Sequence, residues 1–101
     1  MSAYLIAHVD VTNPEGYEEY RAQVPAVIAA YGGRYLVRGG ACEVLEGSGG
    51  TGRRVVLEFP SMAKLKAFWE SPEYGPLRAL RERNADSHIV AVEGVPAAAT
   101  P

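Results

Sequence analysis

Two glycine pairs, Gly32-Gly33 and Gly39-Gly40, bracket a five-residue stretch of strand character, Arg34–Arg38. Glycine adopts the left-handed conformation that ends many helices, so the first pair predicts the end of a helix. The second pair weakens a strand interior and is typical of a bulge or a close approach of two backbones. A helix must therefore precede this stretch, and a short strand that can bend must occupy it.

The residues before this stretch predict a strand followed by that helix. Residues 3–11 are rich in strand formers and apolar on both alternating faces, so this strand needs covering on both sides. Asn13 can cap a helix whose first turn takes Pro14, and apolar residues then recur at helical spacing up to the first glycine pair. Pro25 removes the hydrogen bond to the Arg21 carbonyl, so we expect a kink there.

The residues after the second glycine pair predict further strands and helices. We expect the strand to resume at residues 42–45 and a flexible, glycine-rich hairpin loop at residues 46–52. Two further strands are expected, Arg53–Phe59 and His88–Glu93. Between them we expect a helix Met62–Glu70 capped by Ser61, and a second helix over about residues 76–84 that follows another cap at Ser71. Residues 96–101 are expected to form a flexible tail, which leaves residues 1–95 as a single domain.

The element order β-α-β-β-α-β predicts an α+β, ferredoxin-like fold with a four-stranded antiparallel sheet. Right-handed crossovers put the first and third strands in the centre and both helices on one face. The other face would then expose apolar side chains, namely Tyr4, Ile6, Leu36 and Val56. An exposed apolar sheet face is normally an interaction surface, so we expect a homodimer in which two such faces pack together.

Composition and charge exclude several classes of protein. With 101 residues the chain has the length of one domain, and its hydrophobic fraction of 48% is that of a globular protein. A formal net charge of −2 gives no basic face for nucleic acid. The single cysteine, Cys42, forms no intrachain disulfide and fits a reducing compartment. No signal peptide or membrane span is recognisable, so we expect a cytoplasmic protein with neither nucleic-acid nor membrane partners.

Several spaced motifs over about residues 3 to 95 resemble one small bacterial family, domain of unknown function 1330, within the dimeric α/β-barrel superfamily. The matching motifs are Tyr20…Val24-Pro25, Gly32–Gly40, Glu46-Gly47, Leu57–Ser61, Ser71–Tyr74 and Glu93-Gly94. The resemblance implies a ferredoxin-like subunit that forms a dimer whose two sheets close a barrel. Related dimeric barrels include cofactor-free monooxygenases, lactone isomerases and haem enzymes, so the resemblance implies no particular reaction.

The polar residues on the face away from the helices are the first candidates for chemistry. By strand alternation His8, Arg38 and Glu58 share this face, together with Asp10 and Arg34. In a functional interpretation Arg38 fixes an anionic or carbonyl group, and His8 or Glu58 is the catalytic residue that moves a proton. In the alternative interpretation Arg38 and Glu58 form an ion pair that only orients the dimer. Both interpretations remain open at this point.

A second candidate site is a cleft between the helices and the sheet edge. It would hold a small, partly apolar compound with a carbonyl or carboxylate, without a cofactor, on the residues Tyr20, Arg38, Trp69, Tyr74 and Arg81. The alternative is that its aromatic residues are simply core. No histidine pair has a spacing that chelates a metal, and Cys42 has no neighbouring base, so we expect neither a metal site nor a nucleophilic cysteine. The chain is then either a small-molecule binding protein or enzyme, or a non-catalytic dimeric module.

Overall fold

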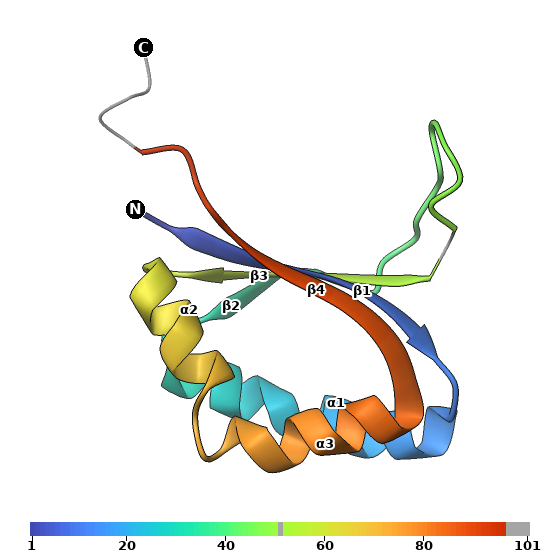
Figure 1. Cartoon of the computed structure of the whole chain (residues 1–101), viewed down its shortest axis with the longest axis horizontal. Helices are drawn as coiled ribbons and strands as arrows, with labels where there is room; N and C mark the ends of the chain where they lie inside the picture. The colour runs from blue at the N-terminus through green and yellow to red at the C-terminus, as the bar shows by residue number, and fades with distance from the viewer. Residues whose placement is uncertain (51, 97–101) are drawn as a thin grey trace.

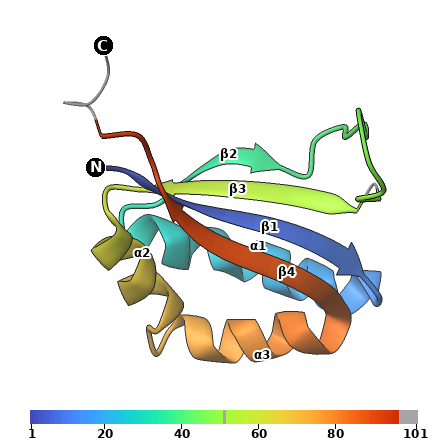
Figure 2. The ribbon, with the colours of Figure 1, turned by 45° about the horizontal axis from the view of Figure 1, so that its top comes forward.

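The computed structural model describes residues 1–50 and 52–96, which form one antiparallel sheet with helices on one face (Figures 1 and 2). The elements are β1 (Ala3–Val11), α1 (Pro14–Ala30), β2 (Arg34–Arg38), β3 (Arg53–Phe59), α2 (Met62–Trp69), α3 (Tyr74–Asn84) and β4 (Ala85–Glu93). The strand order β2-β3-β1-β4 makes β1 and β3 central, as expected. The predicted ferredoxin-like α+β fold is confirmed. Of the tail predicted at residues 96–101, all but Pro96 lies outside the described residues.

The core lies between the sheet and the helices, and strand alternation decides which side chains enter it. In β1, Leu5, Ala7 and Val9 are buried under the helices, while the residues between them face the other way. Phe68 of α2 fills the centre of this layer: its ring centroid lies 5.3 Å from that of Phe59 and 4.5 Å from that of Tyr74. Because all three helices cover the same face, the described residues leave the opposite face of the sheet uncovered (Figure 2).

The glycine pair that follows α1 ends this helix as predicted. Gly32 adopts φ +82°, and the amide of Gly33 donates to the Ile28 carbonyl at 2.9 Å. This is the hydrogen-bond pattern of a glycine helix terminus. The helix runs from Pro14 to Ala30 with Pro25 inside it. The kink expected at Pro25 stays a prediction.

The predicted side-chain cap at Asn13 is wrong, because this side chain has another partner. Asn13 Nδ2 donates to Oδ1 of Asn84, at the end of α3, at 3.0 Å. The backbone carbonyl of Asn84 in turn accepts from the amides of Thr12 and Asn13 at 2.9 and 3.1 Å. Asn84 therefore ties the β1–α1 junction to the α3–β4 junction.

Three predicted element bounds are also wrong. Residues 42–45 are described but form no strand, because the chain leaves the sheet at Gly39, whose φ is +71°. Helix α3 begins at Tyr74, where Ser71 Oγ accepts the Tyr74 amide hydrogen bond at 3.1 Å, and not at about residue 76. Strand β4 begins at Ala85, opposite Val11, because the antiparallel pairing with β1 continues to the end of that strand.

Strand β2 contains a bulge that changes which way its last residues face. Its register on β3 pairs Arg34 with Glu58 and Tyr35 with Leu57, then shifts, so that Val37 lies opposite Val56 and Arg38 opposite Val55. When one strand has an extra residue, the side chains that follow it point to the opposite face of the sheet from the one that alternation predicts. Arg38 therefore points to the helix side of the sheet, and the prediction that it shares a face with Arg34 is wrong.

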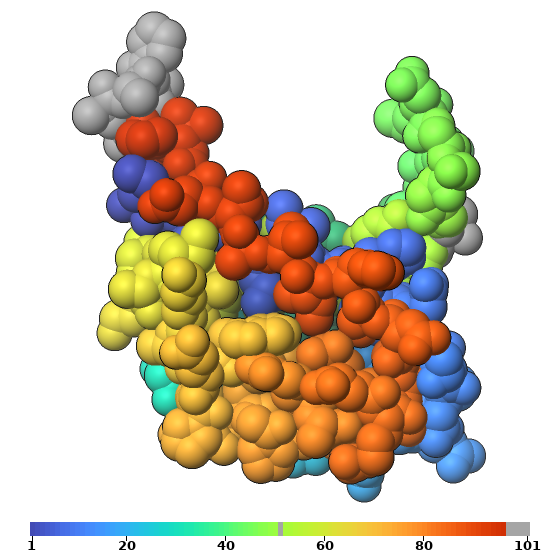
Figure 3. Space-filling model, viewed as in Figure 1, coloured from blue at the N-terminus to red at the C-terminus, as the bar shows by residue number. Residues whose placement is uncertain are grey.

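The face of the sheet away from the helices, which we call the open face, has an apolar centre. Val37, Val56, Ile6 and Val90 lie side by side across the four strands. Val90 is 58% exposed and Ile6 40%. The segment after β2, residues 39–50, rises from the body on this same side (Figures 1 and 3) and carries Leu45, which is 93% exposed. The expected exposed apolar face is confirmed, with Val37 added to it.

Candidate functional site

A cavity of about 40 Å³, which we call the inner cavity, lies between the sheet and the helices. This volume has room for about three water molecules. Its aliphatic walls come from the strands β1, β3 and β4 and from α1. The polar or aromatic side chains that line it are Tyr17, Tyr20, Arg21, Tyr35, Arg38, Arg53, Phe68, Tyr74 and Arg81.

Helical and strand periodicity brings these side chains together. Tyr17, Tyr20 and Arg21 lie one turn apart or less on α1, so they share the face turned to the sheet. Tyr74 and Arg81 are seven residues apart on α3 and also share one face. The phenol oxygens of Tyr20 and Tyr74 meet across the two helices at 3.0 Å. The two hydroxyl groups thus form a polar part of the cavity wall where α1 and α3 face each other.

Two phenols of the cavity, those of Tyr20 and Tyr35, stay neutral at neutral pH. Burial raises the pKa of Tyr20, and the neighbouring Tyr74 phenol raises it further. Burial also raises the pKa of Tyr35, in spite of the nearby Arg38 guanidinium. A neutral phenol donates and accepts hydrogen bonds but is not a base. These residues can orient a ligand, and they cannot take a proton from it at neutral pH.

Three of the four arginines that line the cavity have no carboxylate partner among the described residues. Arg21 pairs with Glu18 at 3.1 Å, but no described carboxylate lies within 4.0 Å of Arg38, Arg53 or Arg81. Arg81 is only 6% exposed. The Nε atoms of Arg53 and Arg81 are buried without a hydrogen-bond partner among the described residues. Because buried charges are normally paired, this arrangement is suited to a ligand that brings a negative charge.

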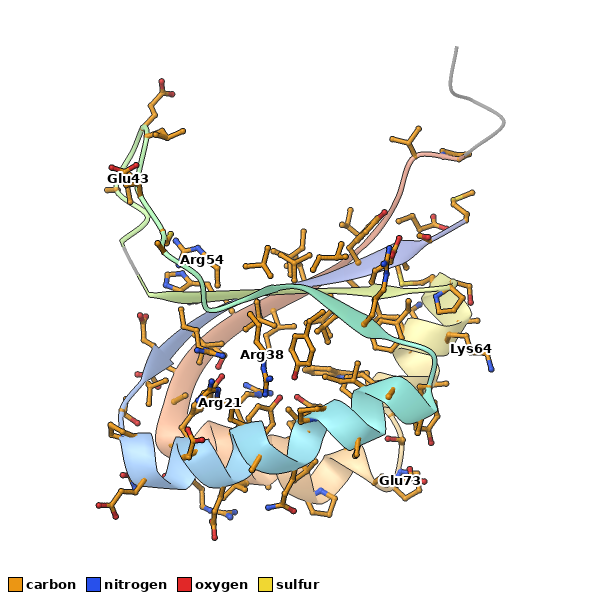
Figure 4. The ribbon with its side chains drawn as sticks, turned by 180° about the vertical axis from the view of Figure 1, so that it is seen from behind. Arg21, Arg38, Glu43, Arg54, Lys64 and Glu73 are labelled. Carbon is orange, nitrogen blue, oxygen red and sulfur yellow. The ribbon has the colours of Figure 1, made fainter. Side chains whose placement is uncertain are left out.

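Arg38 lies between β2 and α1, beside Arg21 (Figure 4). Its Nη2 atom donates to the Arg21 backbone carbonyl at 3.1 Å. Its guanidinium carbon lies 4.7 Å from the centre of the Tyr35 ring, the geometry of a cation–π contact. The side chain is exposed, so Arg38 forms part of the rim of the inner cavity.

The proton-transfer candidates lie on the open face, so the sheet separates them from the inner cavity. Glu58 Oε1 accepts from Nε of Arg34 at 2.7 Å and forms an ion pair with Nη2 at 2.6 Å, and Tyr4 donates to Oε2 at 3.2 Å. The hydrogen bond from Arg34 holds the pKa of Glu58 below its usual value. The expected ion pair of Arg38 with Glu58 is wrong, because the bulge in β2 leaves Arg34 as the partner.

His8 occupies the same face as Glu58. Its Nε2 atom lies 3.5 Å from Oδ1 of Asp10 and is buried without a hydrogen-bond partner in the described part of the chain. Across the sheet His8 has Arg54 on one side and His88 on the other. The structure does not bring His8 near Arg38, since the two side chains point to opposite faces.

Trp69 does not line the inner cavity, although its ring centroid lies 5.5 Å from that of Tyr74 and 6.0 Å from the guanidinium carbon of Arg81. The structure brings Tyr20, Arg38, Tyr74 and Arg81 around the inner cavity, but Trp69 lies outside it at the end of α2. There its ring stacks on the guanidinium of Arg78 at 4.1 Å, and Arg78 donates to the Trp69 carbonyl at 2.7 Å.

Sequence reasoning missed five of the polar or aromatic residues that line the cavity, namely Tyr17, Arg21, Tyr35, Arg53 and Phe68. A signal was present for Arg53, because it alternates with Val55 and Leu57, which face the helices. Arg53 also has its guanidinium carbon 5.8 Å from the centre of the Tyr17 ring.

Ser71 lies outside the cavity, between α2 and α3. Ser71 is structural, as predicted, because its hydroxyl donates to the Phe68 carbonyl at 2.8 Å and accepts from the amide that begins α3. In residues 1–50 and 52–96 no three His, Cys, Asp or Glu side chains gather in a way that would hold a metal ion. None of the described helices has the length and apolar character needed to cross a membrane.

Three solved structures illustrate what the fold is similar to. A protein of unknown function from Rhodopseudomonas palustris is 18% identical with a TM-score of 0.77, over 94% of this chain and 83% of that chain. A dimeric ferredoxin-like protein of unknown function from Jannaschia sp. CCS1 is 13% identical with a TM-score of 0.70, over 93% and 100%. SnoaB, a cofactor-independent oxygenase from Streptomyces nogalater, is 12% identical with a TM-score of 0.62, over 98% of each chain.

At these identities the likeness to solved structures concerns the fold alone. A comparison with curated proteins found no match. The family described as Domain of unknown function (DUF1330) matches residues 2–95, which is nearly the whole chain. The protein therefore belongs to the DUF1330 family.

Proposed function

We propose that this protein is a cytoplasmic homodimer that binds a small, partly apolar carboxylate or carbonyl compound in the inner cavity, without a cofactor. The observation that carries the proposal is the set of cavity arginines, Arg38, Arg53 and Arg81, that have no carboxylate partner among the described residues. A bound carboxylate would supply the missing negative charge and satisfy buried N–H donors in a single step.

Each part of the cavity has a role in this proposal. Arg81, which is almost fully buried, would bind the carboxylate together with the phenols of Tyr20 and Tyr74. Arg38 would contact the same carboxylate from the rim of the inner cavity. The aromatic rings and the strand side chains would pack against the apolar part of the ligand.

The geometry supports binding better than conversion. A reaction with proton transfer needs an acid or base within hydrogen-bond reach of the substrate. Glu58 and His8 lie across the sheet from the inner cavity, and the pKa of Glu58 is lowered. The raised pKa of Tyr20 makes its phenol a poor base at neutral pH.

The homodimer would form through the open face. Packing two such faces together would bury the exposed row that includes Ile6 and Val90. The Jannaschia protein and a similar one from Thermobifida fusca, 17% identical with a TM-score of 0.62, are described as dimeric. A second candidate function, a non-catalytic dimeric module, is favoured by the Arg34–Glu58 pair, which lies on the same face.

Two variants separate ligand binding from assembly, because the sheet separates the residues. We expect Arg38→Ala to weaken binding of benzoate by about tenfold, as for a lost charged hydrogen bond, and to leave the dimer unchanged. Glu58→Gln should weaken the dimer and leave benzoate affinity unchanged. Calorimetric titration and sedimentation measure the two quantities, with the exposed Arg83→Ala and Glu19→Gln as controls.

The outcome decides between the two candidate functions. If acetate, propionate and benzoate all fail to bind at millimolar concentrations, the ligand proposal is rejected and the dimeric module remains. A protein that sediments as a monomer at micromolar concentration would instead reject the dimer, whatever its affinity for carboxylates.

A further inference from the structure

The middle of α1 contains a carbonyl that the helix itself cannot satisfy. Pro25 lies within the helix Pro14–Ala30, eleven residues from its start, and proline has no N–H group. The carbonyl four residues earlier, that of Arg21, therefore lacks its helical donor. A carbonyl in this position needs another partner or water.

Arg38 provides that partner from a different element. Its Nη2 atom donates to the Arg21 carbonyl at 3.1 Å, and the two residues lie together in the space between β2 and α1 (Figure 4). The side chain reaches this position because the bulge in β2 turns it to the helix side of the sheet, opposite Val55. The Tyr35 ring supports the guanidinium at 4.7 Å.

The hydrogen bond to the Arg21 carbonyl occupies only one of the N–H donors of the Arg38 guanidinium. Arginine has five N–H donors in a rigid, planar arrangement, so fixing one Nη group also fixes the direction of the others. No described carboxylate competes for them within 4.0 Å. A long side chain on a cavity rim otherwise samples many rotamers, and ordering it on binding lowers the affinity for a ligand.

We propose that Pro25 is a positioning residue for ligand binding: by freeing the Arg21 carbonyl, it anchors the Arg38 guanidinium at the rim of the inner cavity, ready to receive a carboxylate. The inference rests on the proposed function, because it assigns a use to the remaining donors of Arg38. It also accounts for proline, the least favourable residue in a helix interior, at a position where a plain covering helix would take alanine.

Pro25→Ala tests the proposal. Alanine restores the N–H that binds the Arg21 carbonyl, and as the best helix former it does not endanger folding. We expect benzoate affinity to fall about tenfold, which corresponds to about 1.4 kcal/mol. The affinity for benzyl alcohol, which has the ring without the charge, should not change. Pro14→Ala is the matched control, because the N–H that Pro14 lacks has no intrahelical acceptor at the first helical position.

Two further measurements separate positioning from a merely structural effect. Added to Arg38→Ala, the Pro25→Ala change should cause no further loss of benzoate affinity, since the anchored group is gone. A crystal structure of the unliganded Pro25→Ala protein should have Arg38 detached from the Arg21 carbonyl. This second readout needs no ligand.

The outcomes distinguish this inference from the proposed function. If the unchanged protein binds benzoate and Pro25→Ala binds it equally well, the positioning role is refuted and ligand binding stands. If Arg38 keeps its contact with the Arg21 carbonyl in Pro25→Ala, the role is refuted as well. If the unchanged protein binds no carboxylate but Arg38 detaches in the variant, the anchoring by Pro25 stands and the proposed function falls.

Discussion

Replacing Arg81 by methionine should make the protein more stable and at the same time unable to bind a carboxylate. Arg81 is 6% exposed, its Nε atom has no partner among the described residues, and no described carboxylate lies within 4.0 Å of it. A buried donor left unsatisfied costs about 1–3 kcal/mol. Methionine has a similar length and fills irregular space without a charge.

The net effect follows from two opposing contributions. Removing the unsatisfied donor raises the free energy of unfolding by about 2 kcal/mol. Losing the polar contacts between the guanidinium and the neighbouring phenols lowers it by about 1 kcal/mol. We therefore expect the free energy of unfolding of Arg81→Met to rise by about 1 kcal/mol. In a domain of this size that raises Tm by about 4–8 °C. Arg83→Met, on the exposed side of the same helix, should change the free energy by less than about 0.5 kcal/mol.

Urea unfolding measures the free energy, and thermal unfolding with and without benzoate measures Tm. Both use one fixed protein concentration, because self-association would make stability depend on concentration. Benzoate should raise the Tm of the unchanged protein and of Arg83→Met, and leave that of Arg81→Met unchanged. A variant that loses more than about 1 kcal/mol of stability and still binds benzoate would refute the reasoning. Arg81 would then be a structural residue whose charge is satisfied within the fold.

Three further predictions concern single contacts. Tyr20→Phe removes the hydroxyl that lies 3.0 Å from the Tyr74 hydroxyl and should lower the free energy of unfolding by about 1 kcal/mol. Adding Tyr74→Phe should lower it little further, as a double-mutant cycle would measure. Glu58 has a lowered pKa in the folded protein, so its stabilisation is present above about pH 4.3, the unfolded value, and is lost as the pH falls through the folded value. Glu58→Gln should therefore flatten the acid part of the stability profile in urea melts. Gly33→Ala places a Cβ 2.6 Å from the nearest core ring and should cost about 1–3 kcal/mol, while Gly75→Ala meets open space and should gain up to about 0.5 kcal/mol in the same melts.

Local sequence signals were sufficient for the fold, because each element has its own start and stop residues. Gly32 ends α1 through a positive φ, and Ser61 begins α2 by accepting the Lys64 amide at 3.1 Å. Such signals act within a few residues, so they can be read without knowing the tertiary structure. The element order that results leaves few topologies, and the ferredoxin-like sheet is the one that forms.

The side of the sheet on which Arg38 acts could not be predicted in the same way. Alternation assigns a face only while the register is unbroken. The bulge in β2 depends on how this strand pairs with Val55 and Val56 of another strand, which is a tertiary property. The position of Trp69 likewise depends on the angle between α2 and α3. Arg53 is the opposite case, because unbroken alternation along β3 already pointed it to the helices.

The position of Asn84 has a consequence for how the chain folds. Its side chain and carbonyl bind Thr12 and Asn13, and the side-chain bond joins residues separated by 71 positions. Closing the long loop between Asn13 and Asn84 lowers the entropy of the chain, and this cost precedes the hydrogen bonds at either junction. Neither the first nor the last strand–helix pair can therefore be completed alone. Asn84 therefore couples the two junctions, because neither gains these hydrogen bonds until Thr12 and Asn13 meet Asn84.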